Sequence, residues 1–202
     1  DTLCWSDEIL ATMHIPRAML PEIRPSSAPE PYGLTTADGP FAGVLPICGI
    51  LGDQQAATVG QACFAPGEAK NTYGTGCFML LNTGKKPSFS KSGLITTLCC
   101  TLEDKKPKYA LEGSVFVGGA SIQWLRDQVG IIENAEETNA ICQSIPPLED
   151  LFFVPAFNGL GAPYWDGNAK GSIQGLTFST GRKELVKLFS SVLNRDKDGK
   201  YW

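Results

Sequence analysis

Four short runs of strand-forming residues follow one another in the middle of the chain. They are separated by Gly-Thr-Gly, Thr-Gly-Lys-Lys-Pro and Asp-Lys-Lys-Pro, which are typical strand-ending turns, and cover residues 69–73, 78–82, 93–102 and 109–112. The pattern then changes, because Ile122, Leu125 and Val129 recur at helical spacing. The sequence therefore predicts an antiparallel meander followed by a helix.

The flanking segments predict a mixed α/β chain. Before the meander we expect a short helix in 2–14, a loop in 21–43, a buried apolar strand in 43–51 and a helix in 54–64. After it we expect a helix in 134–143, strands in 151–157 and 172–177, a Gly/Pro-rich loop in 158–171 and a helix in 184–193. The change of pattern near residue 66 indicates the end of one domain and most of another.

Composition narrows the class of protein. Of 202 residues, 43% are hydrophobic and 19% charged, which is enough apolar mass for a folded core. The net charge of −4 argues against nucleic acid as a partner. No apolar run is long enough for a membrane span, and the first residues do not form a signal peptide. The chain begins with Asp, which fits a processed or fragmentary chain.

The cysteines and the single histidine point away from other kinds of chemistry. Seven cysteines, without a C-x-x-C pair, fit reduced and mostly buried thiols in a cytoplasmic protein. His14 alone cannot build a triad or a histidine-rich metal site, so we expect it to be structural, like the Cys99–Cys100 pair. A calcium loop in 166–177 is rejected because Lys170 and Thr177 occupy positions that need carboxylates.

Asp53 is a candidate general base. It lies between the predicted apolar strand and the helix that follows, which is where α/β folds bind ligands. An aspartate before a helix is also a common N-cap, so spacing alone leaves both roles open.

Two glycine-rich segments are candidate phosphate contacts. Gly74-Thr75-Gly76 joins two predicted strands, where backbone N–H groups and a hydroxyl can meet an anion; a plain hairpin turn is the alternative. It is neither a Walker A motif nor a dinucleotide fingerprint. Gly118-Gly119-Ala120 opens the following helix, so its free N–H groups could meet a phosphate or a sugar edge; close helix packing is the alternative.

Taken together, several long segments closely resemble the FGGY carbohydrate kinase family, and within it the members that phosphorylate glycerol. The matching segments are 52–57, 71–78, 110–114, 119–127 and 154–166. The resemblance implies a ribonuclease-H-like, actin-like ATPase fold with two domains closing on a cleft. Residues 1–60 then correspond to the end of the first domain and 61–202 to the beginning of the second, with an atypical tail from about 186.

The resemblance also implies roles for particular residues. Asp53 matches the general base that takes the proton from glycerol, and Gln54 and Phe78 match residues lining the glycerol pocket. The nucleotide contacts that it implies are Gly74, Thr75, Gly76, Gly119, Ile122 and Gln123. ATP and Mg²⁺ are the implied cofactors, although no metal ligand of the family pattern falls in this chain. A cytoplasmic, homo-oligomeric parent enzyme is implied as well.

This sequence departs from the family pattern in several places. The N-terminal phosphate loop, the groups that clamp glycerol and the Asp linked to Mg²⁺ are missing, so we expect this segment alone to be inactive. Ala42 and Val44 replace the Gly and Arg that bind fructose 1,6-bisphosphate in bacterial relatives, and Leu188 and Ser191 depart from the second signature. Two alternatives stay open: a truncated, non-catalytic nucleotide-binding module, and a kinase of another polyol or sugar.

Overall fold

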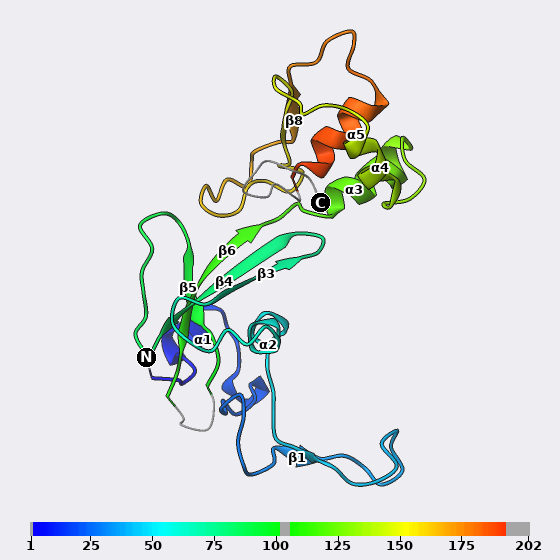
Figure 1. The fold of residues 1–202 in the computed structure, drawn as a ribbon. Helices are drawn as coiled ribbons and strands as arrows, with labels where there is room; N and C mark the ends of the chain where they lie inside the picture. Colours follow the sequence, from blue (N-terminus) through cyan, green and yellow to red (C-terminus); the bar gives the residue numbers. More distant parts are fainter. Residues whose placement is uncertain (1, 102–105, 193–202) are drawn as a thin grey trace.

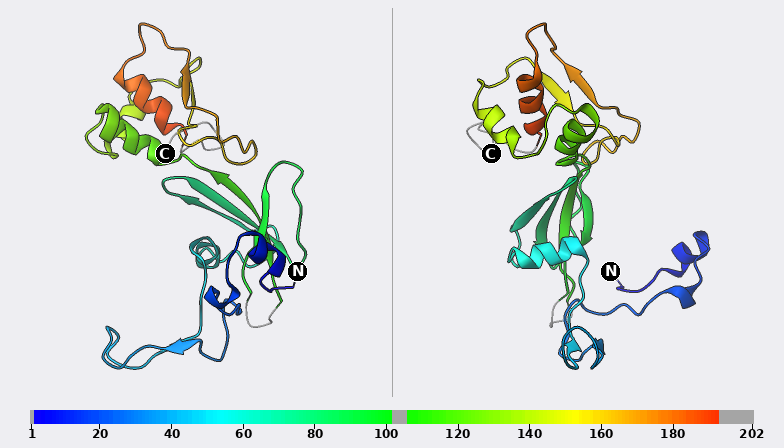
Figure 2. Two further views of the ribbon diagram at one scale, coloured as in Figure 1. Left: turned by 180° about the vertical axis from the view of Figure 1, so that it is seen from behind. Right: turned by 90° about the vertical axis from the view of Figure 1, so that its right-hand side faces the viewer.

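The computed structural model describes residues 2–101 and 106–192, which form three parts in space (Figure 1). A four-stranded sheet lies in the middle. A cluster of helices lies beyond one end of this sheet, and a hairpin arm extends on the opposite side. Two further views show the same separation, with α1 (Asp7–Thr12) projecting away from the sheet (Figure 2). No helix in the described part of the chain is long and apolar enough to cross a membrane.

The central sheet confirms the predicted meander. Its strands are β3 (Ala69–Tyr73), β4 (Cys77–Gly84), β5 (Ile95–Leu98) and β6 (Tyr109–Val115), in the order β3-β4-β6-β5. Every neighbouring pair is antiparallel, as short turn-linked strands require. Leu80 and Asn82 on β4 are almost completely buried, whereas Met79, which points to the other face of the sheet, is exposed. The end of the third predicted run, Leu102, lies outside the described residues.

Helix α2 (Asp53–Gly60) packs against β3 and β4. Leu51 and Val59 contact a small core that contains Leu80, Cys99 and Ala110. Cross-strand partners share a face of an antiparallel sheet, so Lys70, which pairs with Leu80, also lies on the side that α2 covers. The start of α2 and the middle of β3 are thereby brought together.

The second packed unit contains the helices that follow the sheet. It comprises α3 (Ala120–Trp124), a π-helical turn η2 (Leu125–Val129), α4 (Glu137–Gln143), α5 (Arg182–Ser190) and the hairpin of β7 (Phe152–Val154) with β8 (Ser172–Gln174). Leu125, Val186 and Phe189 are its most deeply buried apolar residues. Phe189 stacks on Trp124 and Phe153, which links α5 to α3 and β7. The helices and strands predicted here are confirmed, except that Leu193 lies outside the described residues.

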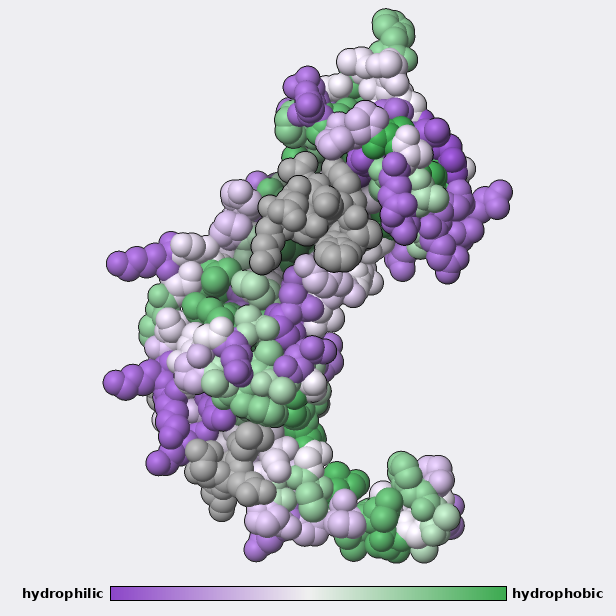
Figure 3. Space-filling view, in the orientation of Figure 1, coloured by the Kyte–Doolittle hydropathy of each residue, from purple (hydrophilic) through white to green (hydrophobic). Residues whose placement is uncertain are grey.

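The arm corrects one prediction. The expected buried strand in 43–51 is wrong, because only β2 (Pro46–Ile47) forms, paired with β1 (Gly33–Leu34). Val44 is 54% exposed and Ile50 is 65% exposed. A strand is buried by its neighbours, and β2 has only β1 beside it in the described residues. The result is an apolar surface on the arm, visible in the space-filling view (Figure 3).

Candidate active site

The first group of predicted site residues gathers at the start of α2. Gly52 is the N-cap of α2, with extended backbone angles, and Asp53 is the first helical residue. The alternative that Asp53 serves as the N-cap is therefore wrong, although its Oδ1 does accept a hydrogen bond from the N–H of Gln54 at 2.9 Å. Asp53 is exposed, so its carboxylate is accessible to a ligand.

Lys70 connects this helix start to the sheet. Its Nζ donates hydrogen bonds to Gln54 Oε1, to Thr72 Oγ1 at 2.8 Å and to the carbonyl oxygen of Phe78 at 3.2 Å. Two predicted acceptor-site residues, Gln54 and Phe78, thus share one ammonium partner. No local signal in the sequence marks Lys70, because its burial depends on the packing of α2 against β3.

The surroundings of Lys70 are charged as well as buried. The residue is only 5% exposed, and burial lowers the pKa of its ammonium group below 10.5, while Glu112 and Asp53 oppose that change. Glu112 lies on the neighbouring strand β6 and accepts a hydrogen bond from Ser114 Oγ at 3.0 Å. The charges of Glu112 and Asp53 therefore favour the protonated form of the buried Lys70.

The second group forms where the β3–β4 turn meets the start of α3. The N–H groups of Gly118 and Ala120 donate to the carbonyl of Thr75 at 2.7 and 3.2 Å, and the N–H of Gly119 donates to the carbonyl of Gly74 at 2.8 Å. The predicted free N–H groups at residues 118–120 are thus wrong, because these groups are used in packing the two glycine segments together. Both segments nevertheless meet, and the side chain of Thr75 is exposed beside them.

Positions 118 and 119 require glycine, because the Gly74–Gly76 turn leaves no space there for a side chain. A Cβ on Gly119 would lie 2.8 Å from the carbonyl oxygen of Gly74, and one on Gly118 would lie 2.8 Å from Cys77 Sγ. Both distances are shorter than real Cβ contacts. The close packing that was the alternative for Gly118-Gly119 is therefore present, and it fixes the Thr75 turn against α3.

A cavity opens next to this contact. It has a volume of about 320 Å³ and is lined by Gly119, Ile122, Gln123, Arg126, Ala135 and Thr138. Three of the six residues predicted as nucleotide contacts thus lie around one cavity, and the other three form the adjoining turn. Thr75 and Phe78 are three residues apart, so about 10 Å of extended chain separates the turn from the Lys70 cluster.

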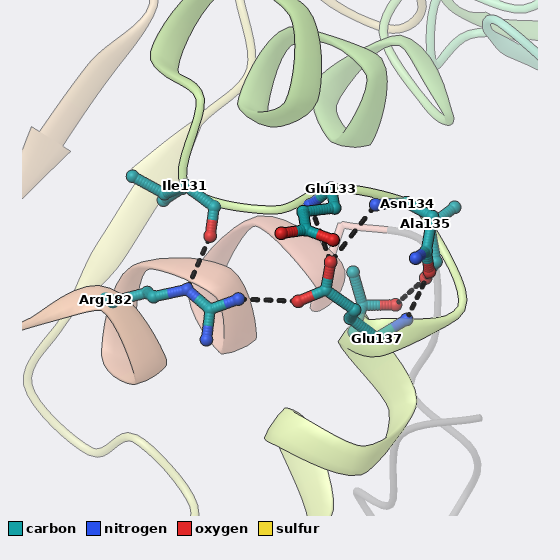
Figure 4. A network of polar contacts seen from close by, with 7 residues as sticks. Ile131, Glu133, Asn134, Ala135, Glu137 and Arg182 are labelled. Atoms are coloured by element: carbon teal, nitrogen blue, oxygen red, sulfur yellow. Dashed lines mark hydrogen bonds and ion pairs between the residues drawn. The ribbon is translucent and has the colours of Figure 1, made fainter.

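A polar network surrounds Glu137, which lies in the chain between the cavity-lining residues Ala135 and Thr138 (Figure 4). The Glu137 carboxylate accepts hydrogen bonds from the N–H groups of Glu133 and Asn134 at 2.6 and 3.1 Å. Arg182 donates to the same carboxylate at 2.6 Å and to the carbonyl of Ile131 at 2.5 Å. These contacts, chiefly the hydrogen bonds from the two backbone N–H groups, lower the pKa of Glu137 below 4.5. The loop that carries Ala135 is thereby fixed to α5.

The cysteines offer no second chemistry. All seven cysteines are free, and five of them are buried, as predicted. Burial raises the pKa of the Cys77 thiol, and burial together with Cys100 raises that of Cys99 to about 11, so neither is activated as a thiolate. Among the residues that the structure describes, no group of three or more His, Cys, Asp or Glu side chains could hold a metal ion.

Comparison with known proteins identifies the family. The model of the C-terminal domain of the FGGY family of carbohydrate kinases matches residues 69–193, so this chain belongs to that family. It is 58% identical over 176 residues to a glycerol kinase of Beijerinckia indica, covering 87% of this chain and 35% of that protein. It is 57% identical over 199 residues to a glycerol kinase of Mycolicibacterium gilvum, covering 98% of this chain and 39% of that protein.

Solved structures give the same fold. The glycerol kinase of Plasmodium falciparum with ADP matches with a TM-score of 0.79 and 41% identity, over 95% of this chain and 38% of that chain. A xylulose kinase from Rhodospirillum rubrum matches with a TM-score of 0.65 at 21% identity, over 93% of this chain and 38% of that chain. The predicted ribonuclease-H-like, actin-like ATPase class is confirmed. The chain spans less than two fifths of the length of these relatives.

Proposed function

We propose that this chain contributes to the ATP-dependent phosphorylation of glycerol to glycerol 3-phosphate. The observation that carries the proposal is the β3–β4 hairpin. Phe78 near the start of β4 shares the ammonium group of Lys70 with Gln54 of α2, and the turn before β4 bonds to the start of α3, where Gly119 lines the cavity. A hydroxyl acceptor and a nucleotide could then meet along one strand. The names of the relatives at 56–58% identity support glycerol as the acceptor.

The proposed chemistry needs a base beside the acceptor. The Asp53 carboxylate takes the proton from a glycerol hydroxyl, the hydroxyl oxygen forms a bond to the γ-phosphorus of ATP, and the bond to the β–γ bridging oxygen breaks to release ADP. Phosphoryl transfer depends mostly on positioning, a role that Gln54 and Phe78 would serve at the glycerol end. Asp53 is exposed in a way that permits such a contact.

The proposed nucleotide contacts follow the other cluster. The Thr75 hydroxyl and the glycines on either side of it would meet the phosphates, and Gly119, Ile122 and Gln123 would line the base or ribose side of the cavity. The described residues offer no metal cluster of their own, so Mg²⁺ would enter bound to ATP. We assign no residue of this chain to the metal.

The same proposal covers organisation and location. We assign residues 1–60 to the first FGGY domain and 61–202 to the second, which the start of the family match at residue 69 supports. A cytoplasmic location is supported by the seven free thiols. A homo-oligomeric parent enzyme remains part of the proposal through the family resemblance alone.

A chimera provides the direct test. This chain would replace the matching segment of the Mycolicibacterium gilvum glycerol kinase, and a coupled assay would measure ADP release with glycerol, xylitol and D-xylulose as acceptors. Turnover that depends on glycerol supports the proposal. A folded chimera that binds ATP without phosphorylating any acceptor favours the non-catalytic module, and preferential turnover of xylitol or D-xylulose favours a kinase of another polyol or sugar.

A further inference from the structure

Lys70 is a buried cation with a specific set of partners. It is 5% exposed, and its three hydrogen-bond acceptors come from α2, β3 and β4: Gln54 Oε1, Thr72 Oγ1 and the carbonyl of Phe78. A lysine is rarely buried so deeply unless it is paired, because removing the ammonium group from water is costly. The charged group of Lys70 therefore joins these three elements through hydrogen bonds.

The chemistry of lysine determines which way the Gln54 amide is oriented. An ammonium group has three donor hydrogens and no acceptor, so only the oxygen of the amide can face it. With Oε1 held by Lys70, the NH₂ group of Gln54 is the part of the side chain left to a ligand. An NH₂ group donates to a hydroxyl oxygen, as a polyol acceptor beside Asp53 would need.

The same ammonium group also fixes Phe78. Its hydrogen bond to the Phe78 carbonyl, at 3.2 Å, ties the backbone of β4 to the helix that carries Asp53 and Gln54. Thr72, the cross-strand partner of Phe78, supplies the remaining contact at 2.8 Å. The two proposed glycerol-binding residues are thus linked through one side chain.

We propose that Lys70 is a positioning residue for the acceptor, which orients the Gln54 amide and holds β4 at the correct distance from Asp53. The inference rests on the proposed function, and it identifies the Lys70 ammonium group as a determinant of the affinity for glycerol. Lys70 does not itself contact the acceptor, because it is buried and its hydrogen bonds go to Gln54, Thr72 and Phe78. Its loss should therefore change the affinity for glycerol far more than the affinity for ATP.

The test compares two buried lysines in the active chimera. Lys70→Met removes the charge and keeps the length of the side chain. Lys187→Met is the matched control, since Lys187 is 3% exposed in α5 and donates to the carbonyls of Cys142 and Ile145, away from the acceptor cluster. Both changes should lower the melting temperature. Only Lys70→Met should raise KM for glycerol, by about 10-fold or more, with KM for ATP within about twofold, as expected for losing hydrogen bonds from a charged donor.

A double-mutant cycle separates positioning from general destabilisation. If Lys70 acts through Gln54, Lys70→Met should add little to the glycerol KM once Gln54→Ala is present. Thr72→Val is a milder probe for the case in which Lys70→Met does not fold, and it should raise the glycerol KM by about two- to threefold. An unchanged glycerol KM in Lys70→Met or Thr72→Val, or fully additive effects with Gln54→Ala, would overturn the inference. Absence of glycerol turnover in the unmutated chimera would instead overturn the proposed function.

Discussion

The two ends of the proposed site are constructed in different ways. At the acceptor end, side chains from α2, β3 and β4 meet around the ammonium group of Lys70. At the nucleotide end, the backbone of the Thr75 turn bonds to the backbone at the start of α3. The two segments approach so closely that a side chain on Gly118 or Gly119 would not fit. One end therefore depends on charge and amide orientation, whereas the other depends on close backbone approach.

This difference separates the kinds of substitution that should matter. A change that keeps shape but removes charge should be severe at the acceptor end, because the groups there act through protons and hydrogen bonds. A change that adds a single methyl group should be severe at the nucleotide end, because the backbone must move to accept it.

The largest effect is expected when the rest of the enzyme is absent. We expect the 202-residue polypeptide on its own to show no glycerol phosphorylation, because the family resemblance assigns the glycerol clamp and metal placement to segments outside it. Positioning of reacting groups can supply about 7 to 11 kcal/mol of the barrier. A coupled assay against a heat-treated sample checks this, and clear turnover by the polypeptide alone would show that the acceptor end is complete within it.

Asp53→Asn tests the acceptor end most directly. In the active chimera, Asn keeps the size of the side chain but cannot accept the hydroxyl proton, so kcat should fall by roughly 10²-fold or more. Since Gly52 is the N-cap of α2, the melting temperature and the KM for ATP should change little. If kcat stays within a few-fold of the parent value, Asp53 is not the base.

Gly119→Ala tests the nucleotide end. The new Cβ would lie 2.8 Å from the carbonyl oxygen of Gly74, so the turn that carries Thr75 must shift. We expect KM for ATP to rise by about 10-fold, in keeping with the cost of overpacking, while KM for glycerol changes little. Gly60→Ala is the control, because nothing lies within 4 Å of a Cβ at that position. Equal ATP affinity in both variants would mean that the backbone contact does not shape the site.

Local patterns were sufficient to predict much of the fold. The strands of the meander and the helices α2 and α5 carry their own signals in turn residues and hydrophobic spacing, and all of them form. The strand expected in 43–51 shows the limit, because Val44 and Ile50 have the composition of a buried strand but burial depends on neighbours that a local pattern does not contain.

The sequence predicted more of the nucleotide end of the site than of the acceptor end. The glycines at 74, 76 and 119 could be selected because close backbone approach limits the choice of residue. The N–H of Gly119 nevertheless bonds to the carbonyl of Gly74, and the N–H of Gly74 bonds to the carbonyl of Gly76. Lys70 could not be selected, since a lysine in a strand usually points to solvent. Only the packing of α2 on β3 shows that it is buried and which groups it joins.

The smallest effect concerns the wall of the nucleotide cavity. Hydrogen bonds from the N–H groups of Glu133 and Asn134, and then the contact with Arg182, lower the pKa of Glu137 below 4.5. A carboxyl group whose pKa is lower in the folded state stabilises the fold above its unfolded pKa, and this stabilisation is lost as the pH falls through the folded pKa. In the chimera, Glu137→Gln should therefore melt below the parent at pH 7, and the difference should shrink as the pH falls below about 4.5.

The matched control for that change is Glu136→Gln, which removes the same charge one residue earlier, where the side chain does not cap the helix. It should leave the pH dependence of melting unaltered. Because exposed ion pairs contribute little, the KM for ATP should rise by no more than about two- to fivefold in Glu137→Gln, with the glycerol KM unchanged. If melting of Glu137→Gln differs from the parent by the same amount at pH 7 and in acid, the carboxylate does not hold the 131–137 loop. The nucleotide end would then depend on its backbone contacts alone, which sharpens the contrast with the charged acceptor end.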